Sequence, residues 1–162
     1  MPLAAAAADW LAATPLSQAM RGSPWLYPVV ETVHIAGFAV LVGAVALFDL
    51  RVLGCAKTLP LRALGRHLLR WALASLLLVI PAGALLFSSQ PREFLSNPVF
   101  LLKLALLATA GLNAAVFHAG AYRGVAAWDA GRPAPPLARA QAALSLLLWL
   151  AIITCGRMLA YV

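Results

Sequence analysis

Charged side chains are scarce in this sequence of 162 residues. Asp and Glu number 5 and Lys and Arg number 12, so 10% of the chain is charged, whereas 64% is apolar and the mean hydropathy is +0.91. Water-soluble chains carry roughly 25% charged residues, and a soluble domain could not bury this much apolar surface. The composition excludes a cytosolic enzyme, a secreted domain and a disordered tail, and it predicts a protein of the lipid bilayer.

Cysteines are also few, and the common catalytic motifs are missing. Cys55 and Cys155 are expected near opposite membrane surfaces, too far apart for a disulfide. The sequence has no HExxH, CxxC, GxSxG, P-loop or dinucleotide-binding motif, so hydrolase, kinase and nicotinamide chemistry are not indicated. A role other than catalysis is favoured. The net charge of +7 is attributed to membrane orientation, and nucleic acid is not expected as a partner.

Four apolar stretches are each long enough to cross about 30 Å of hydrocarbon as a helix. We predict spans at about residues 25–53, 64–87, 99–122 and 137–160. Barrel strands would be about ten residues long and would alternate in polarity, unlike these stretches. The predicted fold is therefore all-α, a polytopic membrane protein whose single domain, residues 1–162, holds four transmembrane helices in an antiparallel bundle.

The segment before the first span, residues 1–22, does not resemble a cleaved signal peptide. It has no basic residue before Arg21, and Asp9 interrupts its apolar run. Large apolar residues such as Trp10 and Met20 alternate with small and polar ones, which suits a short helix lying on the membrane surface. A frayed tail is the alternative.

Basic residues are distributed unequally along the predicted spans. The first and third loops with their flanks hold Arg51, Lys57, Arg62, Arg66, Arg70, Arg123, Arg132 and Arg139. The opposite side holds Arg21, Arg92, Lys103 and Arg157. Because loops rich in Lys and Arg stay in the cytoplasm, both termini are predicted on the outer side of the membrane.

Ionisable residues inside membrane helices are costly and are candidates for function. Four of them, Glu31, His34, Lys103 and Arg157, are expected at a similar depth just below the outer surface. Glu31 and His34 lie three residues apart and share a helix face. The sequence predicts a buried charge cluster there. In the alternative, Lys103 and Arg157 extend to the interface and Glu31 faces water.

Two histidines near the cytoplasmic side suggest a cofactor. His67 begins the second span and His118 ends the third, so their imidazoles could face each other across two helices. Bis-histidine ligation of haem b needs this arrangement, with basic residues for the propionates. Arg66, Arg70 and Arg123 could serve the propionates. In the alternative, both are interfacial histidines bonded to headgroups or loops.

A second candidate site lies near the outer surface. His34, Cys155 and Met158 form a soft ligand set that suits Cu(I), and His34 with Met158 could also be axial ligands of a second haem. Cys155 and Met158 could equally be ordinary packing or lipid-facing residues.

Several motifs resemble a family of small bacterial inner-membrane proteins classed as a domain of unknown function. They are residues 25–37 (WLYPVVETVHIAG), 49–54 (DLRVLG), 97–103 (NPVFLLK), 113–118 (NAAVFH) and 156–157 (GR). The resemblance implies a four-helix protein of the bacterial inner membrane and a looser similarity to copper-resistance D-type proteins and cytochrome-b-type bundles. In such a membrane, the termini that the basic residues place on the outer side are periplasmic. The resemblance implies no established activity. The family pattern has counterparts of Glu31, His34, Arg51, Lys103, His118 and Arg157 but none of His67.

Three functions remain open from the sequence. The protein is a haem-b-binding electron-transfer subunit with a redox partner, a copper-handling membrane protein, or a structural or accessory subunit without a cofactor. Besides the lipid bilayer, a second copy of the chain is a further candidate partner.

Overall fold

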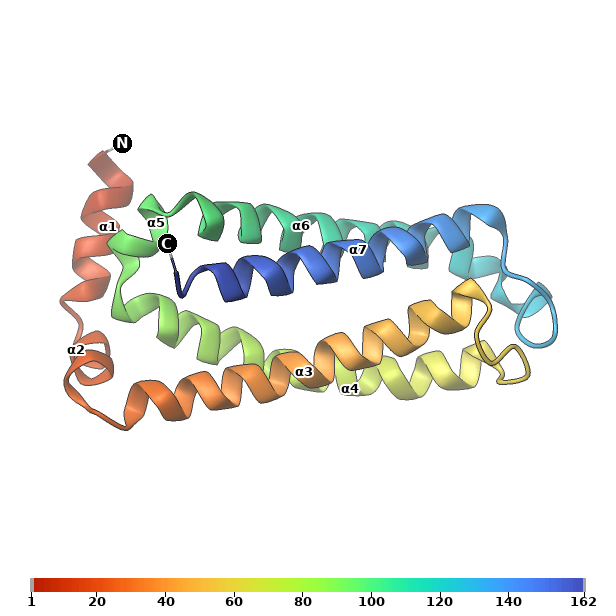
Figure 1. The fold of residues 1–162 in the computed structure, drawn as a ribbon, viewed down its shortest axis with the longest axis horizontal. Coiled ribbons are helices and arrows are strands. Elements are labelled where there is room, and N and C mark those ends of the chain that lie inside the picture. Colours follow the sequence, from red (N-terminus) through yellow and green to blue (C-terminus); the bar gives the residue numbers. More distant parts are fainter. Residues whose placement is uncertain (1, 162) are drawn as a thin grey trace.

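The computed structural model describes residues 2–161, which form helices and connecting segments without any strand. Four long helices run antiparallel to one another (Figure 1): α3 (Leu26–Leu53), α4 (Leu61–Ser89), α6 (Pro98–Ala119) and α7 (Pro136–Met158). Each is long and apolar enough to cross a membrane. Large apolar side chains point outward from the bundle, and Leu77 is 76% exposed. An outer surface of this kind needs lipid rather than water around it, and the prediction of an all-α polytopic membrane bundle is confirmed.

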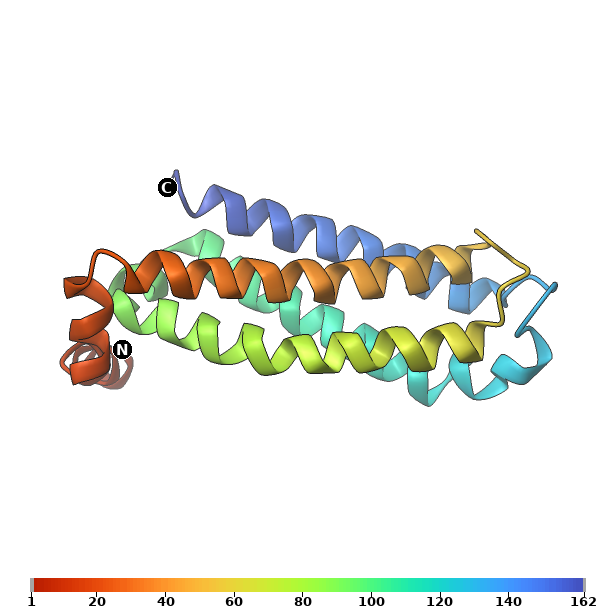
Figure 2. The same cartoon turned by 90° about the horizontal axis from the view of Figure 1, so that it is seen from below.

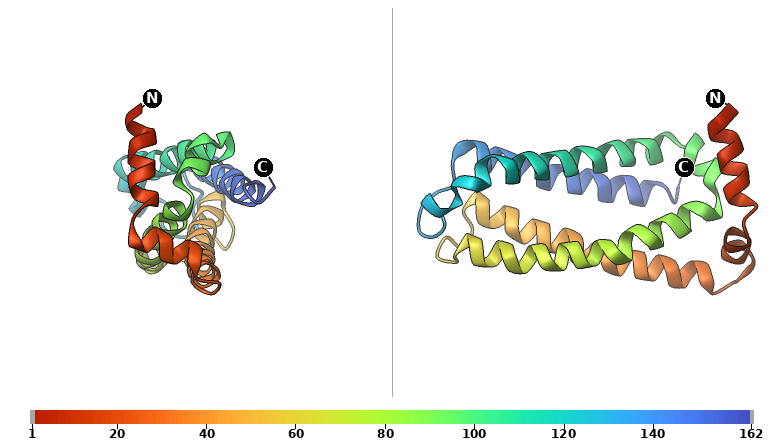
Figure 3. Two further views of the ribbon diagram at one scale, coloured as in Figure 1. Left: turned by 90° about the vertical axis from the view of Figure 1, so that its left-hand side faces the viewer. Right: turned by 180° about the vertical axis from the view of Figure 1, so that it is seen from behind.

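The polypeptide enters the bundle through two short helices, where one was expected. Helices α1 (Pro2–Ala12) and α2 (Pro15–Gly22) cross one end of the bundle (Figure 1, Figure 3). Thr14 separates them and caps α2, because the Ser17 backbone N–H donates to the Thr14 hydroxyl oxygen at 3.3 Å. Trp10 is 72% exposed on α1, as suits a helix at a membrane interface.

Two further short elements connect the long helices. Helix α5 (Pro91–Ser96) links α4 to α6, and the 3-10 helix η1 (Ala121–Ala127) follows α6. The third long helix therefore ends at Ala119, before the expected end near residue 122. Because η1 folds back on the bundle, it brings Tyr122 over the ends of α3 and α4.

The long helices pack as two hairpins. α3 packs most extensively on α4, α6 packs on α7, and contacts between α3 and α7 join the two pairs. Helices α4 and α6 meet through the stacked rings of Phe87 and Phe100, whose centroids are 5.6 Å apart. Both chain termini lie at one end, here called the terminal end, and the segments 54–60 and 120–135 lie at the other, here called the loop end (Figure 1, Figure 2).

A glycine allows the closest approach within the first hairpin. A Cβ atom at Gly37 of α3 would lie 2.9 Å from Val79 Cγ2 and 3.4 Å from Leu78 Cβ, both on α4. Small residues at such crossings bring helix backbones together, which is how helices associate in lipid.

A buried arginine holds the loop end together. Arg51, 3% exposed, donates from Nε to the Leu59 carbonyl at 2.8 Å. Its Nη2 donates to the carbonyls of Lys57 at 3.1 Å and Asp129 at 2.8 Å. The Asp129 carbonyl also accepts the Leu61 backbone N–H at 3.0 Å. Arg51 thus ties both loops to the end of α3.

The terminal end is held by contacts at its surface. The Arg92 guanidinium on α5 forms an ion pair with the Asp9 carboxylate on α1. Hydrogen bonding to Arg92 lowers the pKa of Asp9, and the same bond raises the pKa of Arg92. Arg21 donates to the Ser89 carbonyl at 2.8 Å and to the Ala12 carbonyl at 2.6 Å. The two short helices are thereby fixed to α4 and α5.

Candidate functional site: a cavity at the loop end

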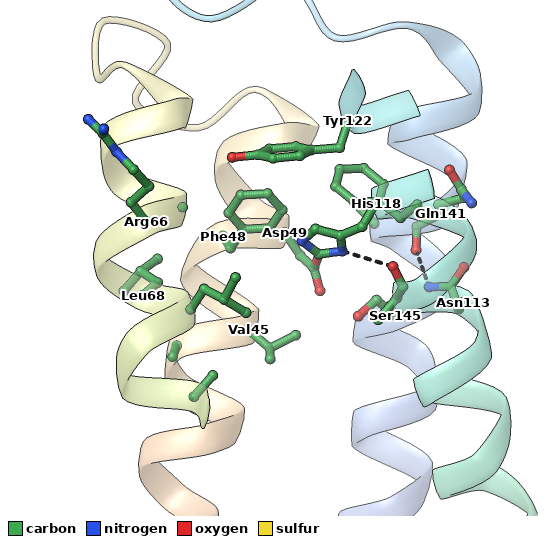
Figure 4. Close-up of a pocket in the computed structure, with 17 residues that line it drawn as sticks. Val45, Phe48, Asp49, Arg66, Leu68, Asn113, His118, Tyr122, Gln141 and Ser145 are labelled. Carbon is green, nitrogen blue, oxygen red and sulfur yellow. Dashed lines mark hydrogen bonds between the residues drawn. The ribbon is translucent and has the colours of Figure 1, made fainter. Parts of the chain in front are cut away.

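A cavity of about 270 Å³ lies between the four long helices near the loop end (Figure 4). Every long helix and η1 contribute to its walls. Most of the lining is apolar, and polar groups come from a few positions. The polar residues are Asp49 on α3, Arg66 on α4, Asn113 and His118 on α6, Tyr122 on η1, and Gln141 and Ser145 on α7.

Asp49 is the acidic residue of this cavity. It lies about one turn before the end of α3 and is 6% exposed. Its side chain points toward Ser145 of α7 (Figure 4), which is within hydrogen-bonding reach of the carboxylate. The Oδ2 atom is buried and has no hydrogen-bond partner. A buried carboxylate oxygen without a partner is costly.

Two amide side chains lie on the opposite wall. The Asn113 Nδ2 donates to the Gln141 backbone carbonyl at 3.0 Å and thereby links α6 to α7 (Figure 4). The Oε1 atom of Gln141 is buried and, like Asp49 Oδ2, has no hydrogen-bond partner. The Gln141 side-chain amide points away from Asp49 (Figure 4), so Asp49 Oδ2 is the unsatisfied acceptor oxygen considered for the cavity.

Three aromatic rings close the cavity toward the loop end. The Phe48 ring lies 5.8 Å from that of Phe117 and 6.1 Å from that of Tyr122, and the Phe117 and Tyr122 rings are 5.8 Å apart. These centroid distances are those of interacting aromatic pairs. Gly65 makes room for them, since a Cβ there would lie 3.0 Å from both Phe48 Cε2 and the Tyr122 hydroxyl oxygen. The trio forms a rigid, electron-rich wall.

His118 lines the same cavity and is exposed. Its ring centroid lies 5.2 Å from that of Tyr122. The Nδ1 atom is 2.8 Å from the Ala114 carbonyl oxygen, so Nδ1 carries the proton and donates it (Figure 4). The Nε2 atom then keeps a lone pair that can accept a hydrogen bond or bind a metal.

The cations near the cavity do not neutralise Asp49. Arg51 donates its hydrogen bonds to the three loop carbonyls described above and not to Asp49. The Arg66 side chain is exposed and points away from the cavity (Figure 4). Among residues 2–161 the Asp9–Arg92 pair is the one salt bridge found, so Asp49 has no ionic partner there.

The other haem candidates lie elsewhere. His67 is exposed and lines a shallow hollow on α4 together with Arg70 and Trp71, with its ring 6.5 Å from that of Trp71. Arg123 is exposed on η1. His67 and His118 do not line a common cavity. A cavity of about 270 Å³ with one imidazole does not fit a bis-histidine haem in this arrangement.

At the terminal end, His34 is half-buried between α3 and α4. Its Nδ1 lies 3.0 Å from the Val79 carbonyl oxygen, two residues before Pro81. Gly83 leaves the space for the imidazole, because a Cβ there would lie 3.0 Å from His34 Cε1. His34 therefore joins the two helices where α4 contains a proline.

Two other members of the predicted charge cluster, Lys103 and Glu31, lie near His34, and Arg157 contacts Tyr161. Lys103 is half-buried. Its Nζ lies near Gly156, where an added Cβ atom would be 3.7 Å from it. Its charge is close enough to interact with His34 and Cys155. Glu31 is exposed and also interacts electrostatically with His34. Arg157 is exposed, and its guanidinium contacts the ring and hydroxyl of Tyr161, so no direct contact joins Arg157 to Glu31 or His34.

The predicted copper ligands Cys155 and Met158 differ in their exposure. Cys155 is buried and Met158 is exposed. No group of three or more His, Cys, Asp or Glu side chains with metal-binding geometry occurs among residues 2–161. Lys103 interacts with both His34 and Cys155, so an ammonium ion lies near the place where Cu(I) would bind.

The sequence prediction missed the centre of the cavity. It treats Asp49 only as the end of the first span, although an acidic residue inside an apolar helix was the available signal. Asn113, Gln141 and Ser145 are uncharged and far apart along the chain, and only the packing of α6 on α7 brings them together.

The fold and cavity define a class: a multi-pass membrane bundle with a largely apolar cavity at one end that holds a few polar groups. Comparisons of the chain with protein-family models, with curated proteins and with solved structures find no match.

Proposed function

We propose that this protein is an integral membrane protein that binds a small solute in the loop-end cavity, as a carrier or sensor. The observation that carries the proposal is Asp49, a buried carboxylate with an unpaired oxygen on a cavity between four spans. Ionisable groups inside membrane bundles commonly mark substrate or ion pathways, and pockets between bundle helices are common ligand sites.

A purely structural role explains this arrangement less well. A bundle that only had to be stable would fill the cavity with side chains, because packing drives helix association in lipid. It would also pair its buried polar atoms. Arg51 meets that requirement with three hydrogen bonds, whereas Asp49 Oδ2 and Gln141 Oε1 do not. Asp49 belongs to the cavity lining, so a solute bound there can supply the partner that the protein does not.

The experiment measures binding to the purified full-length chain in detergent micelles. Benzylamine, benzyl alcohol and benzoate serve as probes of similar size and different charge, and calorimetry measures their affinity. An engineered cavity of about 150 Å³ holds benzene, so a cavity of about 270 Å³ can hold a monocyclic probe. We expect at least one probe to bind saturably, and failure of all three would contradict the proposal.

A cavity-filling variant shows where the probe binds. Val45 lines the cavity, and Val45→Trp should fill it and abolish binding. Val40→Trp is the matched control, because Val40 lies on the same helix but is 45% exposed on the outer surface of the bundle. Equal binding by both variants would show that the probe partitions into the micelle or binds elsewhere.

A haem-b-binding electron-transfer subunit is the second candidate. One observation favours it: the Nδ1–H of His118 donates to the Ala114 carbonyl, which leaves Nε2 free at the cavity. The visible spectrum of the purified protein tests this function, and a Soret band is the result that would support it. His118→Ala should then abolish a low-spin spectrum without preventing membrane insertion, whereas His67→Ala tests the predicted second ligand. A colourless, copper-free protein would remove both metal functions.

Location in the bacterial inner membrane with periplasmic termini also belongs to this proposal. It is supported by the resemblance of the motifs and by the unequal distribution of basic residues. Alkaline phosphatase, which is active only outside the cytoplasm, should be active when fused after residue 162 and inactive when fused near Gly131. The reverse pattern would place the cavity near the outer surface.

A further inference from the structure

The chemistry of the cavity restricts which solute it can hold. Asp49 Oδ2 is buried and unpaired, and a carboxylate oxygen accepts hydrogen bonds. A ligand that satisfies it must donate a hydrogen bond. The Ser145 hydroxyl, within hydrogen-bonding reach of the Asp49 carboxylate, leaves the second carboxylate oxygen for such a donor.

A positively charged ligand complements the Asp49 carboxylate better than a neutral or negatively charged one. Asp49 is 6% exposed, and neither Arg51 nor Arg66 pairs with it. Leaving a buried charge unpaired is strongly destabilising, whereas a charged partner with good hydrogen-bond geometry offsets much of that cost. An anion at this position would be repelled, and a neutral donor would leave the carboxylate without a countercharge.

The walls distinguish an organic cation from a metal ion. Hard metal ions such as Ca²⁺ require six to eight oxygen ligands, and the polar lining provides oxygens from only a few side chains. The remainder is carbon, including the rings of Phe48, Phe117 and Tyr122. Faces of aromatic rings attract organic ammonium groups, and apolar walls accommodate a hydrocarbon body.

We infer that the loop-end cavity binds a small organic ammonium ion, with Asp49 as its counter-ion and the Phe48, Phe117 and Tyr122 rings against its apolar or cationic part. This inference rests on the proposed solute-binding function and names the chemical class of the solute. A cavity of about 270 Å³ limits the ligand to roughly one ring or an equivalent aliphatic chain.

The test compares the same three probes at pH 7 on the full-length chain. Benzylamine is protonated there, benzyl alcohol is its neutral analogue, and benzoate is negatively charged. We expect benzylamine to bind at least 10-fold more tightly than the alcohol and benzoate not to bind. This comparison uses the unmodified protein, so it remains decisive even if a variant of Asp49 does not fold.

Replacing the Asp49 carboxylate tests whether it causes the preference for benzylamine over benzyl alcohol. Asp49→Asn keeps the shape of the side chain but removes its charge, and it should reduce benzylamine affinity at least 10-fold while changing alcohol affinity less than 3-fold. Glu31→Gln is the matched control, because it removes an exposed carboxylate at the other end of the same helix and should leave both affinities unchanged.

The outcomes separate this inference from the function on which it rests. If benzyl alcohol binds as well as benzylamine and Val45→Trp abolishes both, the cavity binds solutes but the ammonium inference is wrong. Unchanged benzylamine binding by folded Asp49→Asn would also overturn it. If no probe binds, the solute-binding function itself fails.

Discussion

The two ends of the bundle differ in the burial of several charged side chains. At the loop end, Asp49 and Arg51 are 6% and 3% exposed, two residues apart on α3. At the terminal end, the charged groups of Asp9, Arg92 and Arg157 are exposed and meet each other or a tyrosine at the surface. Exposed ion pairs are solvated and contribute little to stability. A buried polar group needs hydrogen-bond partners within the protein, or it serves another purpose.

The contrast between Asp49 and Arg51 is more informative still. Arg51 donates three hydrogen bonds to backbone carbonyls of the loops, and that accounts for its burial. Asp49 keeps an unpaired oxygen on a cavity. Burial alone does not mark a functional site. The criterion that separates a structural from a functional buried charge is whether the protein itself completes its hydrogen bonds.

The largest expected effect concerns Arg51. Arg51→Leu would leave the carbonyls of Leu59, Lys57 and Asp129 without their donor, at about 1–3 kcal/mol for each buried group left unpaired. We expect the free energy of unfolding in detergent to fall by at least about 3 kcal/mol. Arg139→Leu, which replaces an exposed arginine on α7, is the control. Equal stability of both variants would mean that the loop end does not depend on Arg51.

A substitution at the crossing of α3 and α4 should have an intermediate effect on the free energy of unfolding. A Cβ at Gly37 would approach Val79 Cγ2 to 2.9 Å, so Gly37→Ala should reduce the free energy of unfolding by about 1–3 kcal/mol through overpacking. Gly43 lies on the same helix, and a Cβ added there would have no atom within 4 Å, so Gly43→Ala should not destabilise. Denaturation of both variants in the same detergent measures the difference.

Replacing Asp49, the proposed counter-ion, should change the free energy of unfolding by a smaller amount and in the opposite direction. Without ligand, Asp49→Asn removes a buried, unpaired charge, so the free energy of unfolding should rise by about 0.5–2 kcal/mol, as at sites that sacrifice stability for function. Glu31→Gln, which removes an exposed charge from the same helix, should change it by less than about 0.5 kcal/mol. A clear loss of stability in Asp49→Asn would instead assign Asp49 a structural role.

The architecture was predictable from the sequence because lipid imposes simple requirements. A run of about 20 apolar residues must be helical to satisfy its backbone, and four such runs predicted four helices. Gly54 ends α3 with φ of +116°, a left-handed conformation that glycine adopts readily. The predicted third span continued to residue 122, because Ala121 and Tyr122 are apolar and composition does not distinguish η1 from α6.

The site was less predictable because its parts come from distant segments. Asp49 and Ser145 meet only through the packing of α3 on α7, which no local pattern encodes. The ionisable residues of the spans pointed to His34 and Lys103 instead. Helix depth was a sound guide to which residues lie near one surface, but the rotation of each helix decides which of them face a common cavity. His118 faces the cavity and His67 does not line it.

The smallest expected effect belongs to the exposed ion pair at the terminal end. Arg92→Ala removes the partner of Asp9 and should loosen α1 from α5, without changing the long helices. Hydrogen exchange measures this as lower protection of the amides of residues 5–12, with unchanged protection in α3. Glu93→Gln, on the same short helix, is the control and should behave as the unmodified protein.

The pH dependence of that protection gives the sharper test. Arg92 lowers the pKa of Asp9 below its ordinary value of 3.8, so the ion pair favours the docked state above that pH. As the pH falls through the lowered pKa, Asp9 becomes protonated and the stabilisation is lost. Protection of α1 should therefore decrease below pH 3.8 in the unmodified protein and stay low at every pH in Arg92→Ala. If both proteins show the same pH profile, the pair does not hold α1, and packing of its apolar residues on α4 and α5 must do so.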